Sequence, residues 1–246
     1  MRRAAILLLS TIALAACNMA ADAQRGEGPR AGGAAVTRNF DVGAFDSVSL
    51  AGSQNVVVAV GGAHSVRAEG DAETIDRLEI RVEDGDLKIG MKKGNWSMGW
   101  GNGRQPVTIY VTAPALIAAA VGGSGDMQID KVEGNRFAAA VGGSGDLRIA
   151  ALRVGEADFS VAGSGEISAA GVAQRSSASV AGSGDIDAGG LESRTASISV
   201  MGSGEVRLRA METANVSIMG SGDVVVTGPA RCTISKKGSG DVRCEA

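Results

Sequence analysis

The second half of the chain alternates apolar and polar residues around a Gly-Ser-Gly-acid motif that occurs seven times. Successive copies are separated by 20, 20, 19, 20, 18 and 18 residues, counted from Ser to Ser. So regular a period predicts an array of equivalent units stacked on one another. The serines of the seven copies are Ser124, Ser144, Ser164, Ser183, Ser203, Ser221 and Ser239.

Apolar residues stand at every second position on both sides of each motif. Three and five positions from the Ser, in either direction, the residues are almost all Val, Ile, Leu or Ala. The positions between them are mostly polar or small. This period of two predicts two short β-strands per repeat, each with one buried and one exposed face. The exposed face before the motif carries a hydroxyl column, Ser160, Ser179, Ser199, Ser217 and Ser235.

Units of 18–20 residues with two strands cannot bury their apolar face alone, so they must stack. Like residues recur at like positions, which fits parallel stacking in register at about 4.8 Å per coil. An antiparallel meander is the alternative, but two-residue hairpin turns prefer Asn-Gly or Asp-Gly. We therefore expect an all-β fold, a single-stranded parallel β-helix (solenoid) with coils of about 18–20 residues.

The chain before the repeats is less regular, and we expect further coils of the same helix there. Ala51-Gly52-Ser53-Gln54 resembles a motif that lacks the acid. Residues 73–78 suit a short helical turn. Glu83-Asp84-Gly85-Asp86 suits a turn between two strands.

Composition narrows the function classes. The 246 residues include 37 Gly and only 3% aromatics, so the core must be built from small aliphatic side chains. The formal net charge is −3. This charge argues against nucleic acid as a partner, because phosphate binding needs a concentrated basic face.

The first residues predict export. Arg2 and Arg3 precede an apolar run over residues 4–16 that is too short to span a bilayer as an anchor. The run ends in Leu14-Ala15-Ala16-Cys17, which resembles the bacterial lipobox, in which the Cys becomes the acylated first residue of the mature protein. An ordinary secretory signal needs no Cys at this position.

The resulting division of the chain has three parts. We expect a lipoprotein signal peptide over residues 1–16, a flexible tether over 17–36 and the β-helical domain over 37–246. Asn18 after the Cys is not the Asp that retains lipoproteins in the inner membrane. The resemblance therefore implies a lipid anchor in the outer membrane.

Two further cysteines fall in the last coil. Cys232 lies seven residues before Ser239 and Cys244 five after it, so both belong to the inward register, one on each strand. Because exported chains meet an oxidising compartment, we expect a disulfide that closes this coil. The alternative is two buried free thiols.

The pattern resembles a known family. The segments FDSVSLAGSQNVVVAVG, LEIRVEDGDLKIGM and VTIYVTAPALIAAAVGGSGDM, followed by Gly-Ser-Gly-acid motifs near every twentieth residue, are similar to bacterial exported proteins with the putative auto-transporter adhesin head GIN domain. The resemblance covers residues 40–246. It implies a right-handed parallel β-helix and a domain of unknown function.

The motifs themselves have two interpretations. A phosphate-binding loop is excluded, because no Lys and helix follow the glycines. In the structural interpretation, Gly on both sides of the Ser permits positive φ, and the acid accepts hydrogen bonds from the N–H groups of its own turn. In the other, the stacked acids repel one another and bind calcium. This metal column is Asp126, Asp146, Glu166, Asp185, Glu205, Asp223 and Asp241.

Little in the sequence points to catalysis. The single His64 has no Cys partner nearby and is interpreted as a surface residue. Asp187 and Arg207 share one outward column in adjacent coils, but one such pair is usually a solvated ion pair. We therefore expect no catalytic residue.

A Gly-rich stretch over residues 94–103 contains both Trp of the chain. Trp96, Met98 and Trp100 form a candidate binding loop, since exposed aromatic side chains on a loop suit contact with sugar or peptide. Alternatively, the loop folds back and its Trp residues cover one end or side of the β-helix.

Together these features predict a non-enzymatic lipoprotein of the cell envelope that displays or binds a protein or glycan ligand. The alternative is a calcium-dependent or carbohydrate-acting β-helix. The sequence names neither the ligand nor any other cofactor.

Overall fold

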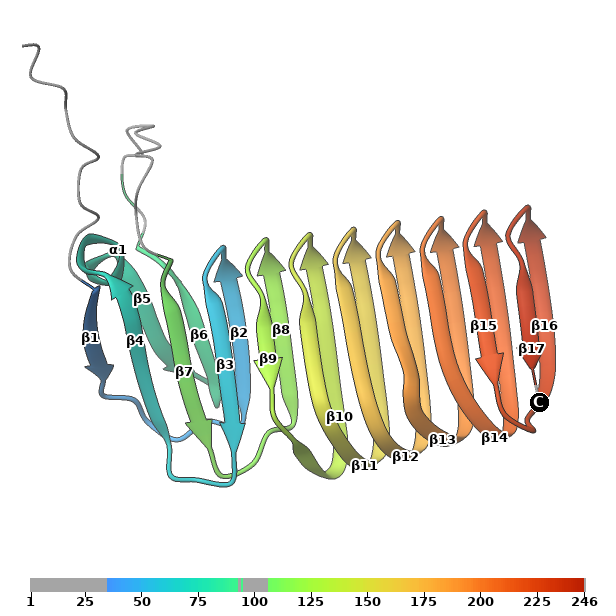
Figure 1. Ribbon diagram of the computed structural model, residues 1–246, viewed down its shortest axis with the longest axis horizontal. Coiled ribbons are helices and arrows are strands. Elements are labelled where there is room, and N and C mark those ends of the chain that lie inside the picture. The colour runs from blue at the N-terminus through green and yellow to red at the C-terminus, as the bar shows by residue number, and fades with distance from the viewer. Residues whose placement is uncertain (1–34, 93, 95–105, 246) are drawn as a thin grey trace, which may run out of the picture. The chain divides into compact units, whose positions relative to one another are not determined.

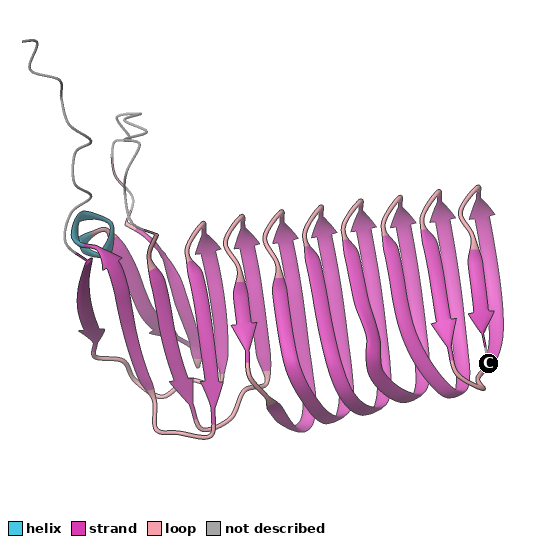
Figure 2. Ribbon diagram, in the orientation of Figure 1, coloured by secondary structure: helices cyan, strands magenta, loops and turns pink. Residues whose placement is uncertain are grey.

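The second half of the chain forms the stack that the repeats predict. The computed structural model describes residues 35–92, 94 and 106–245, and strands make up most of them (Figure 2). All seventeen strands belong to one sheet, and those of successive repeats are hydrogen-bonded in parallel (Figure 1). The expected all-β solenoid is confirmed, and the antiparallel meander is excluded for the repeats.

Each regular coil has a short side after the motif, a bend and a longer side that leads to the next motif. We call the Gly-Ser-Gly-acid turn the corner. Val141, Val161 and Val180 align in register across three coils, as the shared period requires. The strands of this part are β8 (Ala118–Gly123), β9 (Met127–Ile129), β10 (Val132–Gly143), β11 (Leu147–Gly163), β12 (Glu166–Gly182), β13 (Asp185–Gly202), β14 (Glu205–Gly220), β15 (Asp223–Thr227), β16 (Arg231–Gly238) and β17 (Val242–Glu245).

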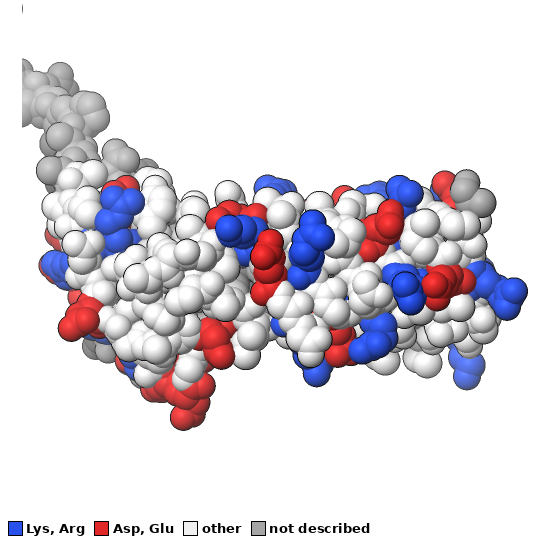
Figure 3. All heavy atoms as spheres, turned by 90° about the horizontal axis from the view of Figure 1, so that it is seen from below, with Lys and Arg blue, Asp and Glu red and all other residues white. Residues whose placement is uncertain are grey.

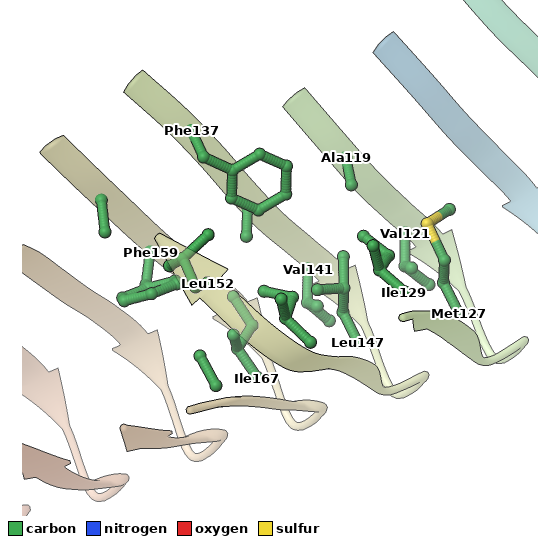
Figure 4. Close-up of a cluster of buried hydrophobic side chains, with 14 of the residues drawn as sticks. Ala119, Val121, Met127, Ile129, Phe137, Val141, Leu147, Leu152, Phe159 and Ile167 are labelled. Atoms are coloured by element: carbon green, nitrogen blue, oxygen red, sulfur yellow. The ribbon is translucent and has the colours of Figure 1, made fainter. Parts of the chain in front are cut away.

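The apolar rows of the two sides face each other and form the core. Leu147 and Ile167 from the short sides pack toward Val141 and Phe159 from the long sides, all at most 2% exposed (Figure 4). The low aromatic content is explained by this geometry, because the two sides leave room mainly for Val, Ile, Leu and Ala.

The last coil departs from this pattern because, among the described residues, no further coil covers it. Ile234 is aligned with the buried Val216 but is 48% exposed. The expected disulfide between Cys232 and Cys244 is present and joins β16 to β17. Lys236 stands in the row that carries Val or Ile in the other coils, and its Nζ donates to the carbonyl of Gly240 at 2.8 Å.

The N-terminal part does contain a coil, but its order in the stack is not the order of the chain. β2 and β3 flank a corner at Gly52 and pair with β8 and β9 on one side. On the other side they pair with β6 and β7, which come later in sequence. The elements are β1 (Ala35–Phe40), β2 (Ser47–Gly52), β3 (Asn55–Val60), β4 (Ser65–Asp71), α1 (Ala72–Asp76), β5 (Leu78–Glu83), β6 (Asp86–Met91) and β7 (Thr108–Ala113).

Beyond this coil the pairing becomes antiparallel, which the prediction of further simple coils missed. β4 pairs antiparallel with both β7 and β1, and β5 forms a hairpin with β6. Asp84 and Gly85 have φ of 53° and 80°, as a two-residue hairpin turn requires, so the predicted turn is confirmed. We call β1, β4, β7 and β3, which lie side by side in that order in Figure 1, the wing.

The predicted helical turn is α1, and it closes this end of the core. Asp71 is its N-cap and accepts hydrogen bonds from the Thr74 N–H at 2.9 Å and the Thr74 hydroxyl at 2.7 Å. Ile75 of α1 is completely buried. A solenoid needs such covering elements, because its terminal coil would otherwise expose its apolar interior.

Candidate functional site

The two glycines of each corner serve different purposes. The first has positive φ at all seven corners, for example 140° at Gly163. The second does not, so the expectation of positive φ on both sides of the Ser is wrong there. A Cβ on Gly165 would lie 2.1 Å from the carbonyl oxygen of Gly145 in the preceding coil. The second glycine is therefore required by the close approach of two backbones.

The corner aspartates accept hydrogen bonds, but from the next coil and not from their own turn. Asp126 Oδ1 accepts the N–H of Asp146 at 3.1 Å, and Asp185 Oδ1 accepts the N–H of Glu205 at 2.7 Å. After Glu166 the pattern changes, since the N–H of Asp185 donates to the carbonyl of Gly165 at 3.1 Å. We call the hydrogen bonds from an acid's backbone N–H to the corner aspartate of the preceding coil the corner ladder. The aspartates that form it are Asp126, Asp146, Asp185 and Asp223.

The corner ladder gives the acids a structural role without a metal. Over the described residues, no group of three or more His, Cys, Asp or Glu side chains is arranged to hold an ion. The acids do stack in register, as Glu166 with Asp185 and Glu205 with Asp223 show. Calcium binding by the column stays a prediction.

The outer face of the long sides carries the predicted hydroxyl column. Ser160, Ser179, Ser199, Ser217 and Ser235 are exposed and aligned from coil to coil. Toward the wing the column continues as Ala140 and Ala120, and there the face is hollowed into an open depression of about 500 Å³ with Ser49 and Asp86 on its far side. The serines and this alanine floor give the face a central stripe of small side chains, and Met201 and Met219, 59% and 54% exposed, lie beside it two positions after the serines of their coils.

A second cavity, of about 430 Å³, lies on the wing. Neighbouring strands align Asn39 with Arg67, Arg67 with Tyr110 and Tyr110 with Val57. The Arg67 guanidinium carbon lies 4.6 Å from the centre of the Tyr110 ring, and Nη1 lies 2.6 Å from Glu69 Oε1. We call this cavity the wing pocket.

His64 also lines the wing pocket and is not a simple surface residue. Its ring is half-buried and packs edge-on against Phe45, with the ring centres 4.8 Å apart. Nε2 lies 2.8 Å from the carbonyl oxygen of Phe45. Because a carbonyl only accepts, Nε2 carries the proton, and Nδ1 remains as the second polar atom of the ring.

Many charged side chains of the stack lie at the bends. Viewed from their side, positive and negative groups alternate along the coils (Figure 3). Arg136 and Asp158 of adjacent coils form an ion pair at 2.6 Å, and this hydrogen bond and charge raise the pKa of Arg136 above its ordinary value. Arg207 pairs with Glu205 at 2.7 Å and not with Asp187, whose Oδ1 accepts the N–H of Gly189. These are surface ion pairs, not a catalytic cluster.

Some predicted sites lie outside the described residues: Cys17 with the whole signal and the tether up to residue 34, and Trp96, Met98 and Trp100 of the candidate loop. The last two residues of the expected tether, Ala35 and Val36, already belong to β1. Sequence reasoning missed the wing pocket. The single Tyr and single His of the chain could have drawn attention to Tyr110 and His64, but no spacing connects them. In the part of the chain that the structure describes, no helix is long and apolar enough to cross a bilayer.

Comparison with solved structures finds the same fold in other bacterial proteins. A putative adhesin from Bacteroides fragilis NCTC 9343 matches with a TM-score of 0.77 and 21% identity, covering 85% of this chain and 96% of its own. A putative adhesin from Parabacteroides merdae ATCC 43184 matches with a TM-score of 0.68 and 18% identity, over 88% and 98%. A protein from Parabacteroides distasonis ATCC 8503 described as a putative lipid binding protein has a TM-score of 0.68 and 26% identity, over 87% and 97%.

The sequence comparisons agree with the fold. No curated protein matches the chain. The sequence profile described as "Putative auto-transporter adhesin, head GIN domain" matches residues 44–230, which contain the wing except β1 and six of the seven corners. The chain therefore belongs to this family of adhesin-like β-solenoid proteins.

Proposed function

We propose that this protein is a non-catalytic, adhesin-like binding module, held in the bacterial cell envelope by lipid on Cys17. Membership of the adhesin family and the adhesin names of two solved neighbours support the binding role. The lipobox-like Leu14-Ala15-Ala16-Cys17 supports the anchor, and Asn18 supports sorting to the outer membrane.

The observation that carries the binding role is the hydroxyl column on the long sides. Each coil adds one exposed Ser at the same position, as Ser179 and Ser199 show, and the parallel register fixes their spacing at about 4.8 Å. A rigid face with evenly spaced hydroxyl groups suits a partner that is itself extended or repetitive. A glycan polymer or an extended protein surface at the cell envelope has this property.

A binding experiment tests the role directly. Full chain, purified in detergent, is incubated with isolated envelope glycans and with envelope proteins, and retention is compared among variants. A variant that carries both Ser179→Lys and Ser199→Lys has two long charged side chains on the face and should lose retention. Ser164→Lys, at an exposed corner, is the matched control and should bind normally. Equal retention of the wild type, the doubly substituted variant and the Ser164→Lys control would refute binding through this face.

The anchor is tested separately. Cys17→Ser should prevent incorporation of a labelled fatty acid and release the protein from the membrane fraction, since no acylated Cys remains. Fractionation of the two membranes should place the wild-type chain in the outer membrane. A Cys17→Ser protein that still incorporates label and sediments with membranes contradicts the anchor.

A calcium-dependent module is the second candidate, favoured by the in-register acid column. Binding of calcium only to the folded state would raise the melting temperature as calcium is added. Titration with magnesium is the control for a general effect of divalent charge. An unchanged melting temperature in saturating calcium would exclude a role of the column in ion binding.

The aromatic loop remains a separate proposal for ligand contact. Trp96→Ala combined with Trp100→Ala should weaken retention of glycan or peptide if these side chains contact the ligand. Unchanged retention would show that the loop has another role.

A further inference from the structure

We propose that the wing pocket binds a neutral saccharide. This proposal names a ligand class for the binding role proposed above and rests on it, but it uses residues that are separate from the hydroxyl column. It depends on three properties of the pocket: its size, the polar groups that line it and the balance of its charges.

The size suits a small ligand. The volume of about 430 Å³ falls in the range of about 300–1,000 Å³ that is typical of small-molecule sites. Parts of four adjacent strands form it, so its shape is fixed by backbone pairing. Val57 and Ala59 give it an apolar surface against which C–H groups can pack.

The polar groups are of the kinds that bind hydroxyl groups. The Asn39 amide and the Asp41 carboxylate lie at one side, and Ser65 and Thr112, aligned on adjacent strands, provide hydroxyls at another. Carboxylates accept and amides both donate and accept, so neighbouring hydroxyls of a sugar can be held by two partners at once. A ligand with several hydroxyls uses these groups better than an apolar one does.

Arg67 adds a donor that is held in place. Its guanidinium lies against Tyr110 and is bonded to Glu69, so two contacts fix its plane. Arg carries five N–H donors, and the contact with Glu69 uses only part of them. Because the guanidinium is already held, less conformational entropy of the Arg67 side chain is lost when a ligand oxygen accepts a hydrogen bond from one of its remaining N–H groups.

The charges of the pocket favour a neutral ligand. Asp41 and Arg67 are its two lining side chains with full charge, and they cancel. Glu69 pairs with Arg67 outside the lining, so the group as a whole has one negative charge in excess, which disfavours an acidic sugar further. An acidic sugar would meet the Asp41 carboxylate, and a cation would meet the guanidinium. Hydroxyl groups without charge avoid both repulsions.

The single tyrosine of the chain allows a direct test. Full chain labelled with ¹³C at the tyrosine Cε positions is purified in a detergent without a sugar headgroup, so that its one ring signal comes from Tyr110. Methyl glycosides of glucose, galactose, mannose and N-acetylglucosamine are titrated, with glucuronic acid as the charged comparison. At least one neutral glycoside should shift the signal in a saturable way.

Variants locate the site. Asp41→Asn and Asn39→Ala, both at exposed positions, should weaken the titration about tenfold or more, equivalent to about 1.4 kcal/mol. Tyr110 is retained in both, so the signal still reports on the pocket, and circular dichroism verifies folding. Ser164→Ala, at an exposed corner outside both the pocket and the hydroxyl column, is the matched control and should titrate as wild type.

The outcomes separate this site from the wider function. No shift with any neutral glycoside, or a shift with glucuronic acid alone, would overturn the proposal. If the signal stays unshifted while envelope retention still depends on Ser179 and Ser199, the pocket proposal fails and the binding module stands. If the glycoside binds and retention does not depend on those serines, the pocket stands and the hydroxyl face fails.

Discussion

The second glycine of a corner offers the sharpest test of why the motif repeats. Gly165 lies in the middle of the stack, where its φ is not in the left-handed region. Substitution to Ala therefore adds no backbone strain of the kind expected at Gly163. It adds one methyl group, 2.1 Å from the Gly145 carbonyl oxygen and 2.7 Å from Val141 Cγ1.

The expected loss of stability follows from the contacts between coils that the new methyl group would displace. Real Cβ atoms stay at least 3.0 Å from such neighbours, so the two coils must separate locally by roughly 1 Å. The N–H groups of Ser164 and Gly165 donate to the Gly143 carbonyl at 2.8 and 3.0 Å, and both bonds would stretch beyond the normal range. Two lost bonds cost about 2 kcal/mol, and overpacking adds about 1–3 kcal/mol.

We therefore expect Gly165→Ala to lower the free energy of unfolding by about 3–5 kcal/mol. Gly163→Ala should cost at least as much, because its Cβ would lie 2.3 Å from the Gly143 carbonyl oxygen and its φ is 140°. Ser164→Ala, between them, removes only an exposed hydroxyl and is the control.

Urea unfolding followed by circular dichroism measures all three variants under the same conditions. If Gly165→Ala unfolds within about 1 kcal/mol of wild type, or if Ser164→Ala is equally destabilising, the close approach of backbones does not explain the glycine.

Three other predictions concern the corners and the C-terminal end. Asp185→Ala removes the acceptor of the Glu205 N–H and should cost about 1 kcal/mol in urea unfolding, whereas Asp185→Asn, which keeps an acceptor oxygen, should cost less; equal losses would contradict the corner ladder. Cys232→Ser opens a loop of 12 residues and should lower stability by about 3 kcal/mol, and reducing agent should lower the melting temperature of wild type but not of this variant. Lys236→Ile replaces the charged member of an apolar row beside the exposed Ile234, and we expect the variant to self-associate in analytical ultracentrifugation. A variant that stays monomeric to the same extent as wild type would show that the lysine does not protect this end.

The regular coils could be predicted because two periods coincide in the sequence. The period of two identifies the buried faces of strands, and the spacing near twenty identifies the coil. Together they leave few arrangements in which Val141, Val161 and Val180 are all buried. The disulfide followed from the same alignment, since Cys232 and Cys244 are both in the inward register.

The order of the N-terminal coil could not be predicted in this way. β2 and β3 pair on one side with β8 and β9 and on the other with β6 and β7, and all four of these strands come later in the chain. A single corner without an acid, at Gly52, does not specify which later strand lies beside it. Long-range pairing of this kind is decided by the whole core and not by a local pattern.

The wing pocket was missed for the same physical reason. Arg67 and Tyr110 come together only because β4 runs antiparallel to β7. No repeat in the sequence indicates this antiparallel pairing. Nor does the sequence show that the corner aspartates bond to the next coil, because the acceptor and donor belong to different repeats. Asp and Glu are interchangeable in the motif, yet in the structure only the aspartates form the corner ladder.

The two ends of the stack are closed by different means, and this difference bears on binding. At the N-terminal end α1 and the antiparallel strands cover the core, and the buried Ile75 belongs to this cover. At the C-terminal end β16 and β17 keep an uncovered edge, where the disulfide fixes the coil and Lys236 places a charge beside Ile234. A charge at the uncovered end opposes the addition of another copy of the protein at this end. The lysines of two such ends would repel one another, and each lysine would lose its hydration. This end of the stack is then no surface for association, whereas the repeating outer face and the wing pocket stay open to a partner.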